Sequence, residues 1–293
     1  MTKHVGFIGL GAIGRPMAEH IANHFPTMVW NRTRERADAF ARETGASVAE
    51  SPRAVVEQVD VVITCLPTSA DVSAVLDAIG DGWREGQLLI DATSGDPAGS
   101  RQAADRLAAF GVGFVDAPVS GGTAGARAGR LTVMLGGEEP WVGQAGEIVE
   151  VYSGKVEHVG PVGAAHALKA VNNALLAINI MAVGEGLAAL VKLGVKAGVA
   201  LDVINASSGR SNVTENLFPE RVVTRAWPRT FRLALLDKDL GVALKVLEDN
   251  GVPSGAIRVA KEAFGAARPV LGEEADHVEL VKEIEKAAGV EIT

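Results

Sequence analysis

The stretch VGFIGLGAIG, residues 5–14, decides the fold. Four apolar residues predict a buried strand, and a Gly-x-Gly-x-x-Gly motif follows directly and opens a predicted helix over residues 16–24. Gly9 permits the tight turn, Gly11 lets backbone approach a pyrophosphate, and Gly14 lets helix pack on strand. A plain strand-to-helix turn is the alternative, but this order favours a dinucleotide-binding loop. The predicted loop comprises Gly9, Leu10, Gly11, Ala12, Ile13 and Gly14.

Outward from this loop, short apolar runs alternate with amphipathic stretches. The expected strands are residues 4–8, 27–30, 59–66, 87–91, 113–116, 131–135 and 156–159. The expected helices between them include residues 16–24, 34–43, 69–79 and 100–110. Strand–helix alternation predicts an α/β fold with a Rossmann-type, doubly wound and mainly parallel sheet.

After residues 160–163 (Gly-Pro-Val-Gly), the composition changes. Residues 164–193 predict one long helix that is apolar on most sides and therefore buried. Only helical patterns follow, at residues 196–207, 214–223, 235–250, 254–266 and 276–288, separated by Gly209, Pro228, Gly251, Pro253 and Pro269. We therefore predict a dinucleotide-binding domain over residues 1–162 and an all-helical substrate and oligomerisation domain over residues 163–293.

Composition and charge exclude several classes of protein. Lys and Arg number 28 against 36 Asp and Glu, so the net charge of −8 argues against nucleic acid or an anionic membrane as partner. The 47% of hydrophobic residues is typical of a globular chain. No signal peptide and no span of ~20 apolar residues is expected, so the predicted location is cytoplasmic.

The single cysteine, Cys65, rules out a disulfide framework and a cysteine-based metal site. It lies in an apolar run, which favours a small buried side chain over a reactive thiol. No cluster of His, Asp and Glu has the spacing of metal ligands, so no metal site is predicted.

The end of the second predicted strand carries Asn31, Arg32, Thr33 and Arg34. An NAD site usually has Asp or Glu here to bind the ribose 2′-hydroxyl. A carboxylate would repel a 2′-phosphate, whereas an arginine grips it and a threonine hydroxyl adds a donor. Asn31, Arg32 and Thr33 therefore predict NADP(H) over NAD(H). The alternative is that the arginines are solvated at the start of the next helix.

Two further strand ends supply candidate cofactor contacts. Leu66 and Pro67 follow the strand over residues 59–66, and Thr93 and Ser94 follow the strand over residues 87–91. The carboxyl ends of strands in an open parallel sheet point into the ligand crevice. We expect Leu66 and Pro67 against adenine or ribose, and Thr93 or Ser94 at the nicotinamide ribose. Ordinary turn chemistry is the alternative.

Residues 116–137 contain the glycine-rich run DAPVSGGTAGA followed by GRLTVMLGG. Ser120, Gly121 and Gly122 have almost no side-chain bulk, so their amides can approach a ligand closely. Consecutive free amides favour an anion such as a carboxylate. A tight turn is an equal alternative for this loop alone, and the other segments favour binding.

The predicted long helix carries Lys169 and Asn173, which are four residues apart and share one face. Burial of an ammonium group lowers its pKa and suits proton exchange near neutrality. A snorkelling surface lysine is the alternative, but the apolar neighbours favour a functional buried lysine. His166, one turn earlier, is expected to be structural.

Together these segments resemble the β-hydroxyacid dehydrogenase family, which includes 3-hydroxyisobutyrate dehydrogenase and 2-hydroxy-3-oxopropionate reductase. The matching pieces are residues 6–18, 116–122, 160–173 and 238–240, in family order and over nearly the whole chain. Two positions depart from the family pattern. Ala165 stands where a glycine is usual, and Thr93-Ser94 reverses the usual order of hydroxyl residues, so which one meets the cofactor stays open.

The resemblance implies an NAD(P)-dependent oxidoreductase that interconverts a small β-hydroxyacid and its semialdehyde. It implies that Lys169 is the general acid/base, that residues 120–122 bind the substrate carboxylate and that Asn173 contacts the reacting end. Lys238 would contact cofactor and substrate, although a lysine between two aspartates is usually a solvated ion-pair residue. A homodimer or homotetramer is also implied. An imine reductase and a non-catalytic dinucleotide-binding module are the alternatives, and Lys169 argues against both.

Overall fold

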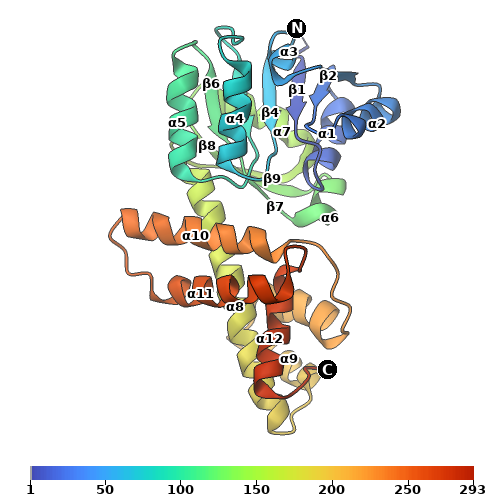
Figure 1. Ribbon diagram of the computed structural model, residues 1–293, viewed down its shortest axis with the longest axis vertical. Coiled ribbons are helices and arrows are strands. Elements are labelled where there is room, and N and C mark those ends of the chain that lie inside the picture. The colour runs from blue at the N-terminus through green and yellow to red at the C-terminus, as the bar shows by residue number, and fades with distance from the viewer. Residues whose placement is uncertain (1) are drawn as a thin grey trace. The chain divides into compact units, whose positions relative to one another are not determined.

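The computed structural model describes residues 2–293 and divides into two compact units, with the division between Lys169 and Ala170 (Figure 1). This division falls inside a long helix, α8 (Ala164–Lys192), whose first turn belongs to the first unit. The expected domain boundary at residues 162–163 lies just before the same helix.

The first unit is built on a nine-stranded sheet with the order β3-β2-β1-β4-β5-β6-β8-β7, in which β9 also pairs with β8. All pairings are parallel except those of β8 with β6 and β7. The order reverses between β1 and β4, the position where open α/β sheets bind ligands. The strands are β1 (Val5–Ile8), β2 (Thr27–Trp30), β3 (Ser47–Val48), β4 (Val61–Thr64), β5 (Leu88–Asp91), β6 (Gly113–Asp116), β7 (Val119–Ser120), β8 (Leu131–Gly136) and β9 (Ser153–Gly160).

Helices cover both faces of this sheet. Neighbouring residues along a strand point to opposite faces, and they belong to two different apolar clusters. Phe7 of β1 and Ile63 of β4 belong to one apolar cluster, whereas Ile8 and Val62 belong to another. The predicted doubly wound sheet is thus confirmed. The helices are α1 (Gly14–Ala22), α2 (Arg34–Thr44), α3 (Pro52–Val56), α4 (Ser69–Ile79), α5 (Pro97–Ala108), α6 (Gly122–Arg127), α7 (Trp141–Val149) and the short η1 (Glu150–Tyr152).

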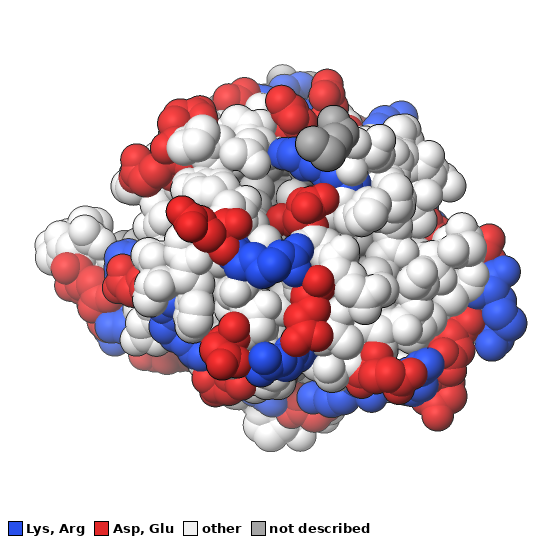
Figure 2. Space-filling view, turned by 90° about the horizontal axis from the view of Figure 1, so that it is seen from above, with Lys and Arg blue, Asp and Glu red and all other residues white. Residues whose placement is uncertain are grey.

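Charged side chains of both signs are interspersed on the face drawn in Figure 2, without a broad area of one sign. In the first unit, the exposed guanidinium of Arg53 pairs with Glu57 at 2.9 Å and with Asp81 at 2.7 Å. Exposed pairs of this kind add little stability.

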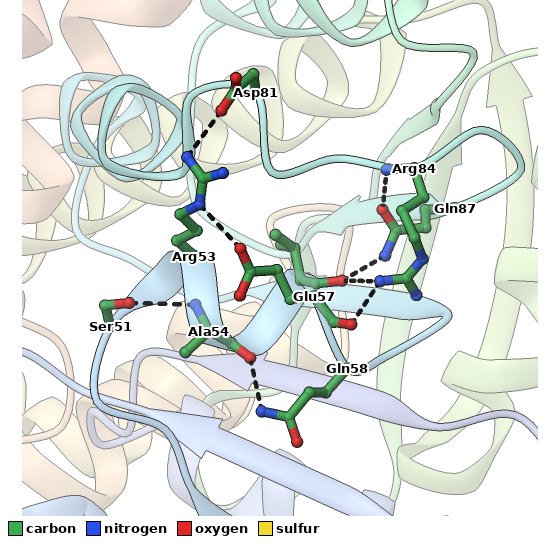
Figure 3. Close-up of polar contacts among 9 residues, drawn as sticks. Ser51, Arg53, Ala54, Glu57, Gln58, Asp81, Arg84 and Gln87 are labelled. Atoms are coloured by element: carbon green, nitrogen blue, oxygen red, sulfur yellow. Dashed lines mark hydrogen bonds and ion pairs between the residues drawn. The ribbon is translucent and has the colours of Figure 1, made fainter.

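The end of α3 is held by a denser polar cluster (Figure 3). The Arg84 guanidinium donates to the carbonyls of Val56, Glu57 and Val59 at 2.6–2.9 Å. The buried side chain of Gln87 donates to two of the same carbonyls at 2.7 Å and accepts from the Arg84 amide. These bonds satisfy the carbonyls left unpaired at the end of α3 and fix the approach to β4.

The second unit is helical, as predicted, and its core lies around Phe218, Leu236, Leu240 and Phe264. It contains the rest of α8 with α9 (Ala197–Asn205), η2 (Val213–Val223), α10 (Leu233–Asp249), α11 (Gly255–Leu271), η3 (His277–Glu279) and α12 (Leu280–Ala288). The Rossmann-type domain followed by an all-helical domain is therefore confirmed.

Helix α8 corrects two expectations. Only 33% of its most apolar 18-residue window is buried, and Leu175 is 55% exposed, so the helix is not enclosed within this chain. Its mean hydropathy of 2.0 over that window and its 29 residues also satisfy the length and composition of a membrane span, contrary to the sequence-based expectation. Core helices of soluble proteins satisfy the same two conditions.

Several elements were not predicted. The strands β3 and β7 have two residues each, which is too short for a periodic pattern. The helices α6 and α7 each contain glycines that lower helix propensity. Pro269 was expected to separate helices, but α11 continues two residues beyond it. The helix expected over residues 214–223 is present as the π-helix η2 (Val213–Val223), which includes Pro219; its π type was not predicted.

Candidate active site

The glycines of the loop after β1 are required for two different reasons. Gly9 has φ +106°, and a Cβ there would lie 2.3 Å from the carbonyl oxygen of Cys65. A Cβ on Gly14 would lie 2.1 Å from the carbonyl oxygen of Gly9. A Cβ on Gly11, in contrast, would meet nothing within 4 Å. The protein's own packing explains Gly9 and Gly14, whereas the open side of Gly11 is where a ligand can approach the backbone.

Asn31, at the end of β2, holds this loop in place. Its Oδ1 accepts a hydrogen bond from the Leu10 amide at 2.9 Å, and its Nδ2 donates to the Thr33 carbonyl at 2.9 Å. A carboxylate would keep the first bond but could not donate the second. The neutral amide is therefore built into the loop, and the adjacent Arg32 and Thr33 are exposed.

The two arginines after β2 have different surroundings. Arg34 pairs with Asp38 at 2.8 Å and with Glu50 at 2.9 Å. Its guanidinium therefore already donates to two carboxylates of the protein. The hydrogen bond to Asp38, followed by that to Glu50, raises the pKa of Arg34. The helix-start interpretation thus fits Arg34, and Arg32 remains the candidate for phosphate binding.

The ends of β4 and β5 are joined by side-chain hydrogen bonds. Thr93 is fully buried, and its Oγ1 accepts from the Leu66 amide at 3.1 Å. Its own amide donates to Asp91 Oδ1 at 3.1 Å. Pro67 is exposed and Ser94 is half-buried. Thr93 therefore positions the loop after β4, and Ser94 is the more accessible of the two hydroxyl residues.

Cys65 directly follows β4 and is half-buried. Burial, with a smaller contribution from the negative charge of Asp91, raises the pKa of this thiol to about 12. Nucleophilic cysteines need a lowered pKa. The interpretation of Cys65 as an inert side chain is consistent with this environment.

The predicted carboxylate loop begins as strand β7, where Val119 pairs with Val133 and Ser120 pairs with Thr132. Gly121 has φ +129° and Gly122 has φ +62°, conformations that glycine adopts readily and other residues do not. Both glycines are exposed, and a Cβ on Gly122 would meet nothing within 4 Å. The loop therefore presents its backbone to the outside without side-chain cover.

Asp116, the last residue of β6, connects this loop to α8. It is fully buried, and its Oδ1 accepts from the Gly163 amide at 2.7 Å while its Oδ2 accepts from the His166 amide at 2.9 Å. Burial raises the pKa of Asp116, and the nearby imidazole of His166 and these amide hydrogen bonds oppose the rise. The carboxylate thereby caps the first turn of α8 with both oxygens.

The His166 side chain forms a second anchor for the same turn. It is 1% exposed, and its Nδ1 lies 2.7 Å from Ser100 Oγ of α5. A Cβ on Gly95 would lie 2.8 Å from His166 Cε1, so the imidazole packs directly on the loop after β5. The expectation of a structural His166 agrees with this burial.

Lys169 follows His166 by three residues, within the first unit. Its side chain is half-buried and its neighbour Leu168 is 43% exposed, so the surroundings are less enclosed than the apolar sequence suggested. Hydropathy summed along a helix overstates burial where one side of that helix is exposed.

The second unit holds a separate polar cluster. Nδ2 of buried Asn173 donates to Asp239 Oδ2 at 2.6 Å, and Lys238 Nζ lies 2.9 Å from Asp239 Oδ1. Nδ2 of Asn172 donates to Oδ1 of Asn173 at 3.2 Å. Lys238 therefore pairs with a buried carboxylate, which differs from a fully solvated charge cluster.

Two aspartates were missed as positioning residues by sequence reasoning. Asp116 and Asp239 both occur in the motifs quoted above, next to residues that received roles. The signal in the sequence was an acidic residue within each motif, and its burial is known only from the structure. Among residues 2–293, the structure contains no group of three or more His, Cys, Asp and Glu side chains suited to a metal ion.

Comparisons with known proteins decide the family. Residues 4–160 match the family model for the NAD binding domain of 6-phosphogluconate dehydrogenase. Residues 163–284 match the family model for the NAD-binding of NADP-dependent 3-hydroxyisobutyrate dehydrogenase. The chain belongs to the β-hydroxyacid dehydrogenase family. The resemblance based on the four motifs is thus confirmed.

Similar proteins cover nearly the whole chain. The 2-(hydroxymethyl)glutarate dehydrogenase of Eubacterium barkeri is 33% identical over 293 residues, which cover 99% of this chain and 97% of the relative. The structure of Mycobacterium tuberculosis 3-hydroxyisobutyrate dehydrogenase with L-serine is 27% identical, with a TM-score of 0.90, and covers 97% of this chain and 99% of that one. Psf3 in complex with NADP+ and 2-OPP is 26% identical, with a TM-score of 0.83 and coverages of 96% and 99%.

Proposed function

We propose that this β-hydroxyacid dehydrogenase family member interconverts a small β-hydroxyacid and its semialdehyde with a preference for NADP(H). One observation carries the proposal. The open glycine loop after β1, the exposed backbone at Gly121 and Gly122, and Lys169 all belong to one compact unit. These are the parts that a hydride transfer with acid–base assistance requires.

The residues around the β1 loop suit a nicotinamide dinucleotide. Gly11 leaves room for a pyrophosphate, and the Asn31 side chain that bonds to the loop carries no negative charge that would repel phosphate. The bound cofactor would supply or accept the hydride. The residues proposed to hold it are Gly9, Leu10, Gly11, Ala12, Ile13, Gly14, Asn31, Arg32, Thr33, Leu66, Pro67, Ser94 and Lys238. Because the Thr93 hydroxyl is buried against the Leu66 amide, its proposed role is to position Leu66.

The preference for NADP(H) rests on the residues after β2. The position that bears a carboxylate in NAD sites is the amide Asn31, and the exposed Arg32 follows it. The family model that matches residues 163–284 is described as that of an NADP-dependent 3-hydroxyisobutyrate dehydrogenase. The similar structure of Psf3 is a complex with NADP+. Both observations support the proposed preference.

The proposed proton transfer involves Lys169. In the direction of reduction, the carbonyl carbon gains a hydride, and the Lys169 ammonium gives a proton to the oxygen, which becomes a hydroxyl. In the direction of oxidation, the neutral amine takes that proton back. The amides of residues 120–122 would bind the substrate carboxylate and so orient the reacting carbon. Asn173 and Lys238 are proposed as further substrate contacts.

A substrate panel tests this function. Purified protein with NADPH is offered small aldehyde acids, including glyoxylate and the succinic, tartronic and methylmalonic semialdehydes, and separately cyclic imines. Loss of NADPH absorbance with at least one aldehyde acid is expected. Turnover of imines alone would assign an imine reductase. Tight NADPH binding without any turnover would assign a non-catalytic module.

We also propose that the chain forms a homodimer or homotetramer through the exposed apolar side of α8. Leu168, Leu175 and Leu193 on or next to this helix are 43%, 55% and 79% exposed. A second copy would remove this surface from water, as the hydrophobic effect favours. In this proposal α8 is a core helix of a cytoplasmic assembly and not a membrane span. Light scattering at micromolar concentration tests it, and a monomer would contradict it.

A further inference from the structure

The carboxylate of Asp116 connects two segments of the first unit that the proposed reaction needs at a fixed separation. The loop with Ser120, Gly121 and Gly122 starts four residues after Asp116, where the chain passes from the end of β6 into β7. The helix with Lys169 starts at the amides that Asp116 accepts, from Gly163 and His166. Asp116 therefore precedes the loop directly in the chain, and its side chain holds the start of the helix.

The two hydrogen bonds of Asp116 orient the start of α8. The Gly163 amide precedes α8 and the His166 amide belongs to its first turn, so the two oxygens of Asp116 hold two points of that turn at 2.7 and 2.9 Å. The Ala167 amide donates to the Gly163 carbonyl at 3.0 Å, which continues the turn toward Lys169. Hydrogen bonds between charged groups and amides are stronger than neutral ones.

The surroundings of Asp116 are shaped for this carboxylate. A Cβ on Gly136 of β8 would lie 2.6 Å from Oδ1 and 2.8 Å from Oδ2 of Asp116. Gly163 has φ +91°, and a Cβ there would lie 3.0 Å from the Pro97 carbonyl oxygen. Both glycines thus permit the carboxylate and the helix start to approach as closely as they do.

We propose that Asp116 is a positioning residue for the reaction, because its carboxylate fixes where α8 presents Lys169 relative to the amides of Ser120, Gly121 and Gly122. This role rests on the proposed function, since it requires Lys169 to act as the acid. Misplacing an acid by a fraction of an ångström slows proton transfer without removing the ability to bind cofactor.

Asp116→Asn tests the role in the full-length protein. Asn has a single acceptor oxygen, so it satisfies one of the two amides and presents its own amide group to the other. With an active substrate from the panel, we expect kcat per NADPH-binding site to fall about tenfold or more, and the solvent isotope effect on kcat to rise. The Kd for NADPH and the KM for the aldehyde acid should stay close to the wild-type values.

Asp96→Asn is the matched control. Asp96 caps α5 in the same unit, but its carboxylate accepts from one amide, that of Gly99, through one oxygen at 2.8 Å. Asn preserves that single bond while removing the same charge. We expect kcat and the solvent isotope effect of this variant to remain those of the wild type.

Gly136→Ala gives an independent perturbation if Asp116→Asn yields no folded protein. The added methyl displaces the Asp116 carboxylate but leaves its charge and both acceptor oxygens in place, and we expect the same loss of kcat.

A role limited to stability would lower Tm but leave kcat per NADPH-binding site and the isotope effect unchanged, and that result in either variant would overturn the proposal. If Lys169→Ala itself keeps wild-type kcat, the proposed function fails; if Lys169→Ala is inactive while Asp116→Asn is not impaired, only the positioning role fails.

Discussion

Asp239 accepts a hydrogen bond of 2.6 Å from the side-chain amide of Asn173, and both residues are buried. An ionised carboxylate can only accept, so the Nδ2 of Asn173 must face Asp239 and its Oδ1 must face elsewhere. The other oxygen of Asp239 pairs with Lys238 at 2.9 Å. One carboxylate thus orients two residues that are proposed to contact the substrate.

Asp239→Asn should therefore lower kcat/KM by about tenfold or more, because the single acceptor oxygen of asparagine cannot serve both Asn173 and Lys238, and a buried donor left without its acceptor costs about 1–3 kcal/mol. Steady-state kinetics with the active aldehyde acid measures this. Asp237→Asn is the control, since Asp237 is also buried on α10 but pairs with Lys261. Equal losses in the two variants would show a general effect of altered charge in α10 and not an effect on Asn173.

The 2′-phosphate of NADPH is expected to contact Arg32. Arg32→Ala should raise the KM for NADPH by about tenfold or more and leave the KM for NADH unchanged, because a charge-assisted hydrogen bond contributes about 1.5–3 kcal/mol. Arg34→Ala should have a smaller effect, since Arg34 already pairs with Asp38 and Glu50. A wild-type enzyme with a higher kcat/KM for NADH than for NADPH would contradict the proposed preference.

Gly11 and Gly14 should respond differently to alanine. Gly14→Ala places a methyl 2.1 Å from the Gly9 carbonyl oxygen and should destabilise the fold by about 1–3 kcal/mol, as overpacking does. Gly11→Ala meets no protein atom and should keep the Tm of the wild type while weakening NADPH binding. Thermal unfolding and a fluorescence titration with NADPH measure the two effects. Unimpaired NADPH binding by Gly11→Ala would remove this glycine from the cofactor site.

Asp276 should make the second unit sensitive to acid. Burial by itself raises the pKa of Asp276, but hydrogen bonds from His277, Phe231 and Thr230 outweigh it and hold the pKa below its ordinary value. A lowered pKa in the folded state adds stability above the unfolded pKa of about 4, and this stability is lost as pH falls further.

The expected result is that Asp276→Asn lowers the free energy of unfolding at pH 7, and that its difference from the wild type narrows below about pH 4. Urea unfolding across this range provides the measurement. A difference that is constant with pH would show that the Asp276 carboxyl is not held below its ordinary pKa.

Local patterns predicted the first unit well, because its signals are contained in short segments. The run from Val5 to Gly14 specifies strand, turn and helix within ten residues. The strand ends with Leu66, Thr93 and Asn31 followed from the same periodicity. Whether each of these side chains holds a loop or meets a ligand depends on hydrogen bonds that periodicity does not report.

The polar anchors could not be predicted in this way. Asp116 bonds to an amide 47 residues away, and Asn173 bonds to a carboxylate 66 residues away. Pairings over such separations are decided by the assembled fold. The burial of α8 was overestimated for a related reason, since its apolar residues lie on all sides and the exposed side is not visible in the composition.

The central claim is that the Lys169 side chain transfers the proton. The most direct measurement is kcat of Lys169→Ala with NADPH and the active aldehyde acid, together with the Kd for NADPH of the same variant. The account predicts that kcat falls by about 100-fold or more while NADPH binding is retained, since a positioned acid contributes about that much to the rate. A kcat close to that of the wild type would contradict it.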